Sequence, residues 1–252
     1  MAPTPHERPF RVHLTGFGPF RQYSENPSWL AVRQLEGITM KEAPPPLAAL
    51  ETPSEPQSPS PPAPLQPTIA LSTSLIPVNY TDALELVPPL HDQDEPYDLI
   101  IHVGVGAPGG VVLERRARRW GYDKEGADGK LAESDGKRRG FVGEEWNVGE
   151  ELQTRISREK VVEWVRRKGV EHLALSSDAG LYLCEFTFFC SLATAQRKAS
   201  AKASAHPTPV QFIHVPPLKE PYNVEQLTSA LKLLVWAIVN EGGLSDLLEQ
   251  AT

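Results

Sequence analysis

The sequence is short of cysteine, with only two in 252 residues. Cys184 and Cys190 lie six positions apart within one predicted helix. Because a helix rises about 1.5 Å per residue, their Cα atoms would be roughly 9 Å apart, which is beyond the reach of a disulfide. We therefore expect two free thiols and no intrachain disulfide.

Long apolar runs are also missing. Residues 1–10 hold no apolar segment of signal-peptide length, and no later stretch is long and apolar enough to span a bilayer. Together with the scarcity of cysteine, these absences predict a cytoplasmic protein without membrane contact, in which thiols stay reduced.

Positive charge is in deficit as well, since the formal net charge is −7. A nucleic-acid-binding protein needs a basic face to meet the phosphates, so we expect no nucleic-acid partner. The clusters Arg115-Arg116, Arg118-Arg119 and Arg166-Arg167-Lys168 are accordingly interpreted as solvated faces. We also expect no metal ion and no cofactor, and no feature of the sequence indicates an oligomeric state.

The sequence does contain an alternation of strand and helix patterns. Strands are predicted over residues 11–15, 68–78, 99–105, 111–114, 172–175 and 210–215, and helices after 26–27, over 81–90 and 156–168, from 182 onward and over 223–241. Continuous apolar strands such as 99–105 are typical of a parallel sheet covered on both faces. We therefore predict a single domain over residues 1–252 with a three-layer α/β/α fold and a twisted, largely parallel central sheet.

Three segments interrupt this alternation. Residues 42–67 are rich in proline, serine and alanine and are predicted to be a disordered insertion. Residues 198–209 are rich in alanine, serine and lysine and form either a flexible insertion or an extension of the preceding helix. Residues 120–150 carry many glycines, aspartates and lysines and are predicted to be an extended surface excursion.

A single thiol stands at the start of a predicted helix. The strand at 172–175 is followed by the tight turn Asp178-Ala179-Gly180 and by a helix that opens near Tyr182. Cys184 then lies in the first turn, where unpaired N–H groups and the helix dipole favour the thiolate, the form that attacks carbonyls. Cys184 is therefore the candidate nucleophile, and Cys190 is interpreted as inert core.

Cysteine catalysis also needs a base and a group that orients the base. His214 lies near the carboxyl end of its strand, just before Pro216-Pro217, and Glu114 follows three apolar residues. We expect both to emerge at the same edge of the sheet as Cys184. Two alternatives stay open, because a histidine in an apolar strand is most often a core residue and a buried Glu114 could pair with a neighbouring arginine.

Two glycine-containing loops follow strands. Phe17 and Phe20 flank the turn Gly18-Pro19 and are either core residues or the apolar wall of a ligand pocket, since ligands collect at the carboxyl ends of strands. Residues 104–109 match the pattern G-x-G-x-x-G, but a proline interrupts it and no strand ending in an acidic residue follows at the expected distance. We interpret it as a turn, and a nucleotide-dependent oxidoreductase is the weaker alternative.

Taken together, these motifs resemble the pyroglutamyl peptidase I (pyrrolidone-carboxylate peptidase) family of cysteine exopeptidases. The resemblance rests on blocks that run in family order, namely residues 15–20 with 26–29, 102–105 with 113–114, 177–180 with 182–184, and 214–217 with 221–223. It implies removal of an N-terminal 5-oxoproline from peptides, so the expected partners are pyroglutamyl peptides. It further implies that Cys184, His214 and Glu114 are the catalytic residues.

The resemblance also implies a substrate pocket. Phe17 and Phe20 match the family's substrate-clamping phenylalanines, and Tyr182 takes the place of an aromatic residue at the pocket. Val105 stands where bacterial members carry a glutamine that contacts the ring, so backbone groups would have to replace that hydrogen bond. The alternative function is a catalytically inactive binding protein on the same scaffold, for which the two insertions leave room.

Overall fold

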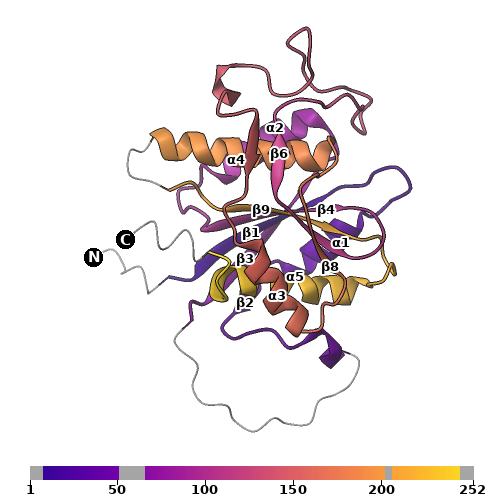
Figure 1. Ribbon diagram of the computed structural model, residues 1–252, viewed down its shortest axis with the longest axis vertical. Helices are drawn as coiled ribbons and strands as arrows, with labels where there is room; N and C mark the ends of the chain where they lie inside the picture. The colour runs from indigo at the N-terminus through magenta and orange to yellow at the C-terminus, as the bar shows by residue number, and fades with distance from the viewer. Residues whose placement is uncertain (1–7, 51–65, 202–205, 245–252) are drawn as a thin grey trace.

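The computed structural model describes residues 8–50, 66–201 and 206–244. A seven-stranded sheet crosses the molecule in the strand order β2-β3-β1-β4-β9-β5-β8 (Figure 1). Its strands are β1 (Phe10–Phe17), β2 (Thr39–Met40), β3 (Ile69–Ile76), β4 (Leu99–Val105), β5 (Val111–Glu114), β8 (Leu173–Ser176) and β9 (Val210–Val215). A separate ribbon pairs β6 (Arg116–Arg118) with β7 (Glu151–Gln153).

The sheet is largely parallel, as predicted. β3, β1, β4 and β9 are parallel neighbours, and β5 and β8 are parallel to each other. The β5–β8 pair runs antiparallel to β9, and the short β2 runs antiparallel to β3. The reversal of β5 follows from its connection to β4, because residues 106–110 are too few for a parallel crossover, which takes about a dozen or more.

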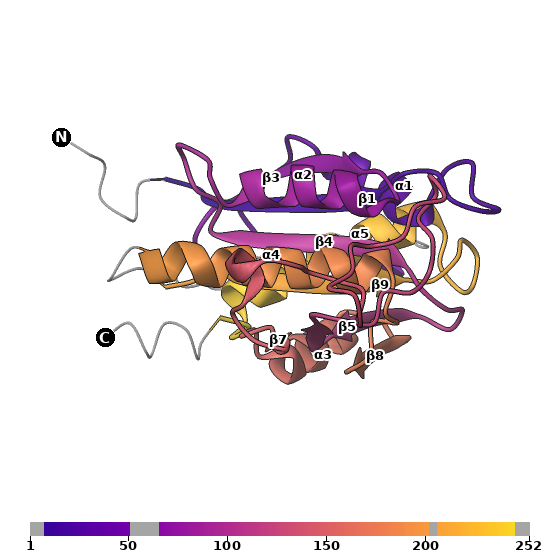
Figure 2. The same cartoon turned by 90° about the horizontal axis from the view of Figure 1, so that it is seen from above.

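Helices cover both faces of the sheet, which confirms the three-layer α/β/α fold. α1 (Pro27–Val32), α3 (Arg158–Arg167) and α5 (Val224–Asn240) lie on one face, and α2 (Tyr80–Leu90) and α4 (Leu183–Ala201) lie on the other (Figures 1 and 2). Three 3-10 turns are also present, η1 (Arg33–Leu35), η2 (Leu47–Leu50) and η3 (Glu144–Trp146). None of the helices in the described part of the chain could cross a membrane, given its length and polarity.

The two faces of the sheet carry chemically different cores. Under α1, α3 and α5 the buried residues are mainly aliphatic, whereas under α2 and α4 they are largely aromatic. In the aromatic core the rings of Phe141 and Phe186 stack with centroids 4.0 Å apart, and Phe189 lies 4.7 Å from Phe141. The α4 helix is therefore clamped between the sheet and the segment that contains Phe141.

This packing corrects the prediction for residues 120–150. The segment has little regular structure, but it is not a surface excursion, because Tyr122, Phe141 and Trp146 are buried in the aromatic core. Its glycines and charges occupy the exposed turns, while the aromatic rings between them cover the outer side of α4. Burial of these rings is what holds the segment in place.

The two predicted insertions are described in part. Leu47 is buried, and its N–H donates to the carbonyl of Lys168 at the end of α3 (2.8 Å), so this part of the predicted insertion is anchored on the domain. Residues 51–65 lie outside the described residues. In the second insertion α4 continues to Ala201, as the alternative of a helix extension anticipated, and residues 202–205 lie outside the described residues.

Candidate active site

Cys184 is the second residue of α4, so its predicted place in the first turn of a helix is confirmed. The thiol is free and half-buried, whereas Cys190, also free, is fully buried. Gly104 of β4 makes room for the sulfur: a Cβ at this position would lie 2.8 Å from Cys184 Sγ and 3.0 Å from Phe212 Cζ. Side-chain carbons do not approach so closely, so the position of Cys184 depends on a glycine here.

His214 and Glu114 meet across the β5–β9 ladder. His214 Nδ1 lies 2.9 Å from Glu114 Oε1, and both side chains are largely buried. The strand register aligns Glu114 with Phe212, two residues before His214, so the pair are diagonal neighbours on one face of the sheet. Gly106 approaches the other side of His214, where an added Cβ would lie 2.9 Å from the Cβ of the histidine.

The route by which Glu114 reaches His214 differs from the prediction. The two residues do not emerge from one carboxyl edge, because β5 runs antiparallel to β9. Nor does Glu114 pair with its neighbours in the chain, since Arg115 binds the side chain of Gln153 and Arg116 pairs with Glu151. Glu114 therefore contacts His214 from the neighbouring antiparallel strand β5.

The Cys184 sulfur also lies close enough to the imidazole of His214 to shift its pKa. Burial alone would lower the pKa of His214, but the Cys184 sulfur and the Glu114 carboxylate outweigh burial and raise this pKa. The geometry thus favours an imidazolium held between a sulfur and a carboxylate. The second oxygen of Glu114, Oε2, is buried without a hydrogen-bond partner among the described residues, so the histidine is the principal partner of this carboxylate.

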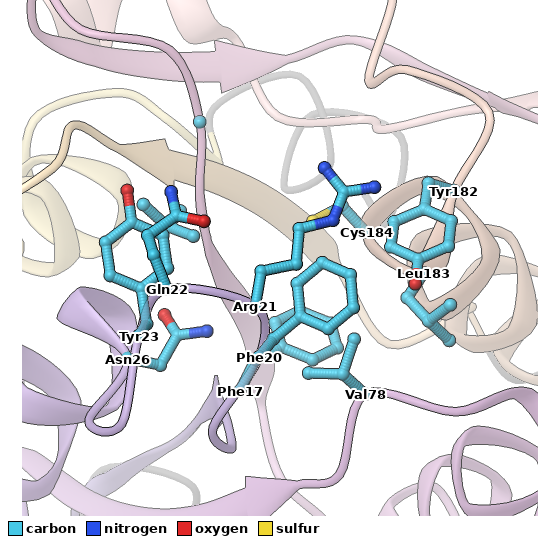
Figure 3. Close-up of a pocket in the computed structure, with 12 residues that line it drawn as sticks. Phe17, Phe20, Arg21, Gln22, Tyr23, Asn26, Val78, Tyr182, Leu183 and Cys184 are labelled. Atoms are coloured by element: carbon cyan, nitrogen blue, oxygen red, sulfur yellow. The ribbon is translucent and has the colours of Figure 1, made fainter. Parts of the chain in front are cut away.

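A cavity of about 240 Å³ opens beside Cys184 (Figure 3). All four predicted pocket residues, Phe17, Phe20, Val105 and Tyr182, line it. The rings of Phe20 and Tyr182 lie 5.6 Å apart between centroids, and the Tyr182 hydroxyl donates to the carbonyl of Glu125 (2.8 Å). The other lining residues are Arg21, Gln22, Tyr23, Asn26, Val78, Gly106 and Leu183.

Comparisons with known proteins identify the family of this chain. The model of the pyroglutamyl peptidase family matches residues 67–233, which include Glu114, Cys184 and His214. Human pyroglutamyl-peptidase 1 is 30% identical over 249 residues, an alignment that covers 95% of this chain and 92% of the human protein. The chain belongs to the pyroglutamyl peptidase family. This is a family of cysteine peptidases.

Solved structures of family members have the same fold. Pyroglutamyl peptidase I from Bacillus amyloliquefaciens superposes with a TM-score of 0.66 at 20% identity, covering 92% of this chain and 96% of the bacterial one. A mutant pyrrolidone carboxyl peptidase from Pyrococcus furiosus gives the same TM-score and identity, with coverages of 94% and 99%.

In this family member the glycines of residues 104–109 do not form a dinucleotide site. That motif requires a helix to begin after the glycines, so that its N-terminus meets the pyrophosphate. Here β4 is followed by the strand β5, and Gly104 and Gly106 instead leave space for Cys184 and His214. The oxidoreductase alternative is therefore wrong.

A polar network beside Cys184 was not predicted from the sequence. Glu185, fully buried, accepts from both the backbone N–H (3.0 Å) and the Nε (2.6 Å) of Arg118 and from the N–H of Leu181 (2.8 Å). Arg118 also pairs with Asp178, so the network ties the 177–182 loop to the start of α4. One signal in the sequence was a carboxylate between Cys184 and Phe186 in an apolar helix, since such a charge has to be paired.

Proposed function

We propose that the protein is a cysteine exopeptidase that removes an N-terminal pyroglutamyl residue from peptides through a thioester acyl-enzyme. One observation carries this proposal: the Cys184–His214–Glu114 arrangement opens directly onto a small cavity with aromatic walls. The names of the curated relatives, such as human pyroglutamyl-peptidase 1, support the same activity.

The chemistry of the cavity suits the pyroglutamyl ring. This ring is a compact, neutral lactam without an α-ammonium group, and apolar walls with a few hydrogen-bonding groups match it. Among the described residues that line the cavity none is acidic, so an ordinary charged N-terminus would find no carboxylate partner there. Phe17 and Phe20 would contact the faces of the ring, and Tyr182 and Val105 would close its sides.

The proposed acylation step uses the sulfur and the imidazolium together. The Cys184 thiolate attacks the pyroglutamyl carbonyl carbon and forms a C–S bond, while free N–H groups in the first turn of α4 stabilise the oxyanion. When the intermediate collapses, the C–N bond breaks and His214 transfers its proton to the departing amine. Glu114 holds Nδ1 of the imidazole and so keeps Nε2 directed at the reacting atoms.

Deacylation reverses these roles. His214, now neutral, takes a proton from a water molecule, and the resulting hydroxide attacks the thioester carbon. The C–S bond breaks, free pyroglutamate leaves and the thiolate–imidazolium pair is restored. A cytoplasmic location is part of the proposal, because a reducing compartment keeps a nucleophilic thiol free.

The decisive experiment compares two fluorogenic amides, one pyroglutamyl and one with an unblocked aminoacyl group. We expect the wild type to hydrolyse only the pyroglutamyl amide, and Cys184→Ala to lose at least about 10³-fold in kcat with an unchanged unfolding transition. Cys190→Ala is the matched control, because it removes the buried thiol and leaves Cys184 in place.

Two other outcomes of this experiment would contradict the proposal. Full activity in Cys184→Ala would overturn the mechanism. Binding of pyroglutamyl peptides by the wild type without turnover would favour the inactive binding protein on the same scaffold.

A further inference from the structure

Arg21 occupies an unusual backbone position at the mouth of the cavity. It lies with Gln22 in a two-residue turn that is closed by hydrogen bonds between Phe20 and Tyr23, at 3.0 and 2.9 Å. The φ of Arg21 is 50°, in the left-handed region that favours glycine. An arginine held in this conformation beside a candidate active site is a reason to look for a role of its side chain.

The side chain of Arg21 is directed toward the site. Its guanidinium carbon lies 4.9 Å from the centre of the Phe20 ring, and the residue lines the same cavity as Cys184. Figure 3 shows the guanidinium reaching across the opening between Phe20 and Tyr182. Burial raises the pKa of Tyr182 and the positive charge of Arg21 opposes this rise, which places the two groups within electrostatic range.

Within the described part of the chain, no acidic side chain neutralises this positive charge. Among the described residues, none offers Arg21 a carboxylate within ion-pair distance; Glu25, four positions along the chain, pairs with Arg33. The other residues around the cavity carry no acidic group either. A guanidinium presents a rigid fork of N–H donors that fits a carboxylate in two places, so the mouth is suited to an anionic group of the substrate.

We propose that Arg21 is a specificity-determining residue that favours substrates with a carboxylate on the residue directly after pyroglutamate. The inference rests on the proposed function, since it takes the ring into the aromatic end and the scissile carbonyl to Cys184. The following residue then leaves through the mouth, past the guanidinium. Its carboxylate is either an aspartate or glutamate side chain or the free end of a dipeptide.

The experiment measures kcat/KM for a matched set of substrates. Pyroglutamyl-glutamate amide carries a side-chain carboxylate, pyroglutamyl-glutamine with a free terminus carries a main-chain one, and pyroglutamyl-glutamine amide is the neutral reference. We expect each acidic substrate to exceed the reference by about threefold to fivefold at low salt, and the ratio to fall toward one at high salt. The relative size of the two ratios identifies which carboxylate Arg21 prefers.

Arg21→Gly is the informative variant, because glycine suits a φ of 50° and the turn should fold at least as well. In this variant the ratios of acidic to neutral substrate should fall to about one, and in Arg21→Glu they should drop below one. Arg167→Gln on α3, an exposed arginine outside the site, changes the net charge equally and should keep the wild-type ratios.

Two results would count against the proposal in different ways. Ratios that are equal in the wild type and in Arg21→Gly, with the neutral amide turned over, would overturn the role of Arg21 alone. Failure of the wild type to hydrolyse any pyroglutamyl substrate would overturn the proposed function and this inference with it.

Discussion

At the scale of single residues, the site depends on what surrounds His214. The Cys184 sulfur lies on one side of the imidazole and the Glu114 carboxylate on the other, 2.9 Å from Nδ1. Both partners raise the pKa of the histidine against the effect of burial. On the proposed mechanism the leaving amine needs the protonated imidazole, so Glu114 should extend activity toward alkaline pH.

Glu114→Gln tests this role. The substitution removes one of the groups that raise the pKa of His214, so this pKa should fall and the alkaline limb of kcat/KM should move to lower pH. We also expect kcat to fall by roughly 10² to 10⁴-fold, because the orientation of the imidazole is less well defined. Glu163→Gln, an exposed change on α3, is the control. An alkaline limb that stays in place would contradict the electrostatic role of Glu114.

Some of these residues could be predicted from the sequence, and others could not. Cys184 could be predicted because a strand, a glycine turn and a helix start leave a local pattern in the sequence. Arg21 was not, because its importance comes from the direction of a side chain and from the absence of a nearby carboxylate, which a local pattern does not encode. Glu185 lies between these cases, since its burial follows from its apolar neighbours but its partner Arg118 is 67 residues away.

At the scale of elements, β4 and the residue after it closely approach the proposed catalytic side chains, Cys184 and His214. β4 lies beside β9, and its residue Gly104 leaves the space that Cys184 Sγ occupies. The φ of Gly104 is not in the left-handed region, so its backbone conformation does not require glycine. Glycine is required because a side chain would occupy the space of the Cys184 sulfur. The backbone of β4 therefore sets how near the sulfur can come to the sheet.

Gly104→Ala should separate activity from stability. The new methyl group would lie 2.8 Å from Cys184 Sγ in the native position, so the sulfur must rotate away from His214. A displacement of about 1 Å at a reacting atom costs about 10²-fold in rate, which is the expected fall in kcat/KM. Alkylation by iodoacetamide should slow as well.

Gly18→Ala is the control for this change, because the new Cβ would lie 3.4 Å from the Leu75 side chain, an ordinary van der Waals distance. Thermal unfolding of both variants shows whether the fold is retained. Wild-type turnover in a folded Gly104→Ala protein would show that the sulfur does not need this space.

The direction of β5 was the main error at this scale. The six longer strands could be predicted from apolar runs, whereas β2, β6 and β7 are only two or three residues long and were not predicted. The relative direction of strands depends on connection length, and the five residues 106–110 already required a reversal. The place of β9 between β4 and β5 could not be predicted, because two strands close together in the sequence are here separated by one that follows about 100 residues later.

At the scale of the whole molecule, buried histidines away from the site limit stability in acid. Burial lowers the pKa of His13 to about 4, and that of His91 likewise to about 4. His13 is held between the hydroxyls of Ser72 (2.9 Å) and Ser74 (2.8 Å), an arrangement that suits the neutral ring.

We predict a loss of stability as the pH falls from about 6.5 to 4. In this window the unfolded chain binds protons that the folded histidines do not, so the free energy of unfolding rises with pH and is lost on acidification. For His13 the full effect is roughly 3 kcal/mol.

Urea unfolding between pH 4 and pH 8 measures this loss. The slope of the unfolding free energy against pH reports the number of protons taken up on unfolding, and in His13→Gln this number should fall by up to about one. Substitution of the exposed His206 by glutamine should leave the slope unchanged. An identical slope in the wild type and in His13→Gln would show that His13 is not responsible.

The position of β9 determines when, during synthesis of the chain, the sheet and the candidate active site can form. β9 inserts between β4 and β5, and it begins at Val210, so a chain still emerging from the ribosome cannot close the sheet until residues 210–215 have been made. Cys184 and Glu114 are synthesised earlier, but His214, which links them, arrives with β9. On the proposed mechanism the nascent chain is therefore a latent peptidase until β9 joins the sheet, and the arrival of β9 is the step that activates it.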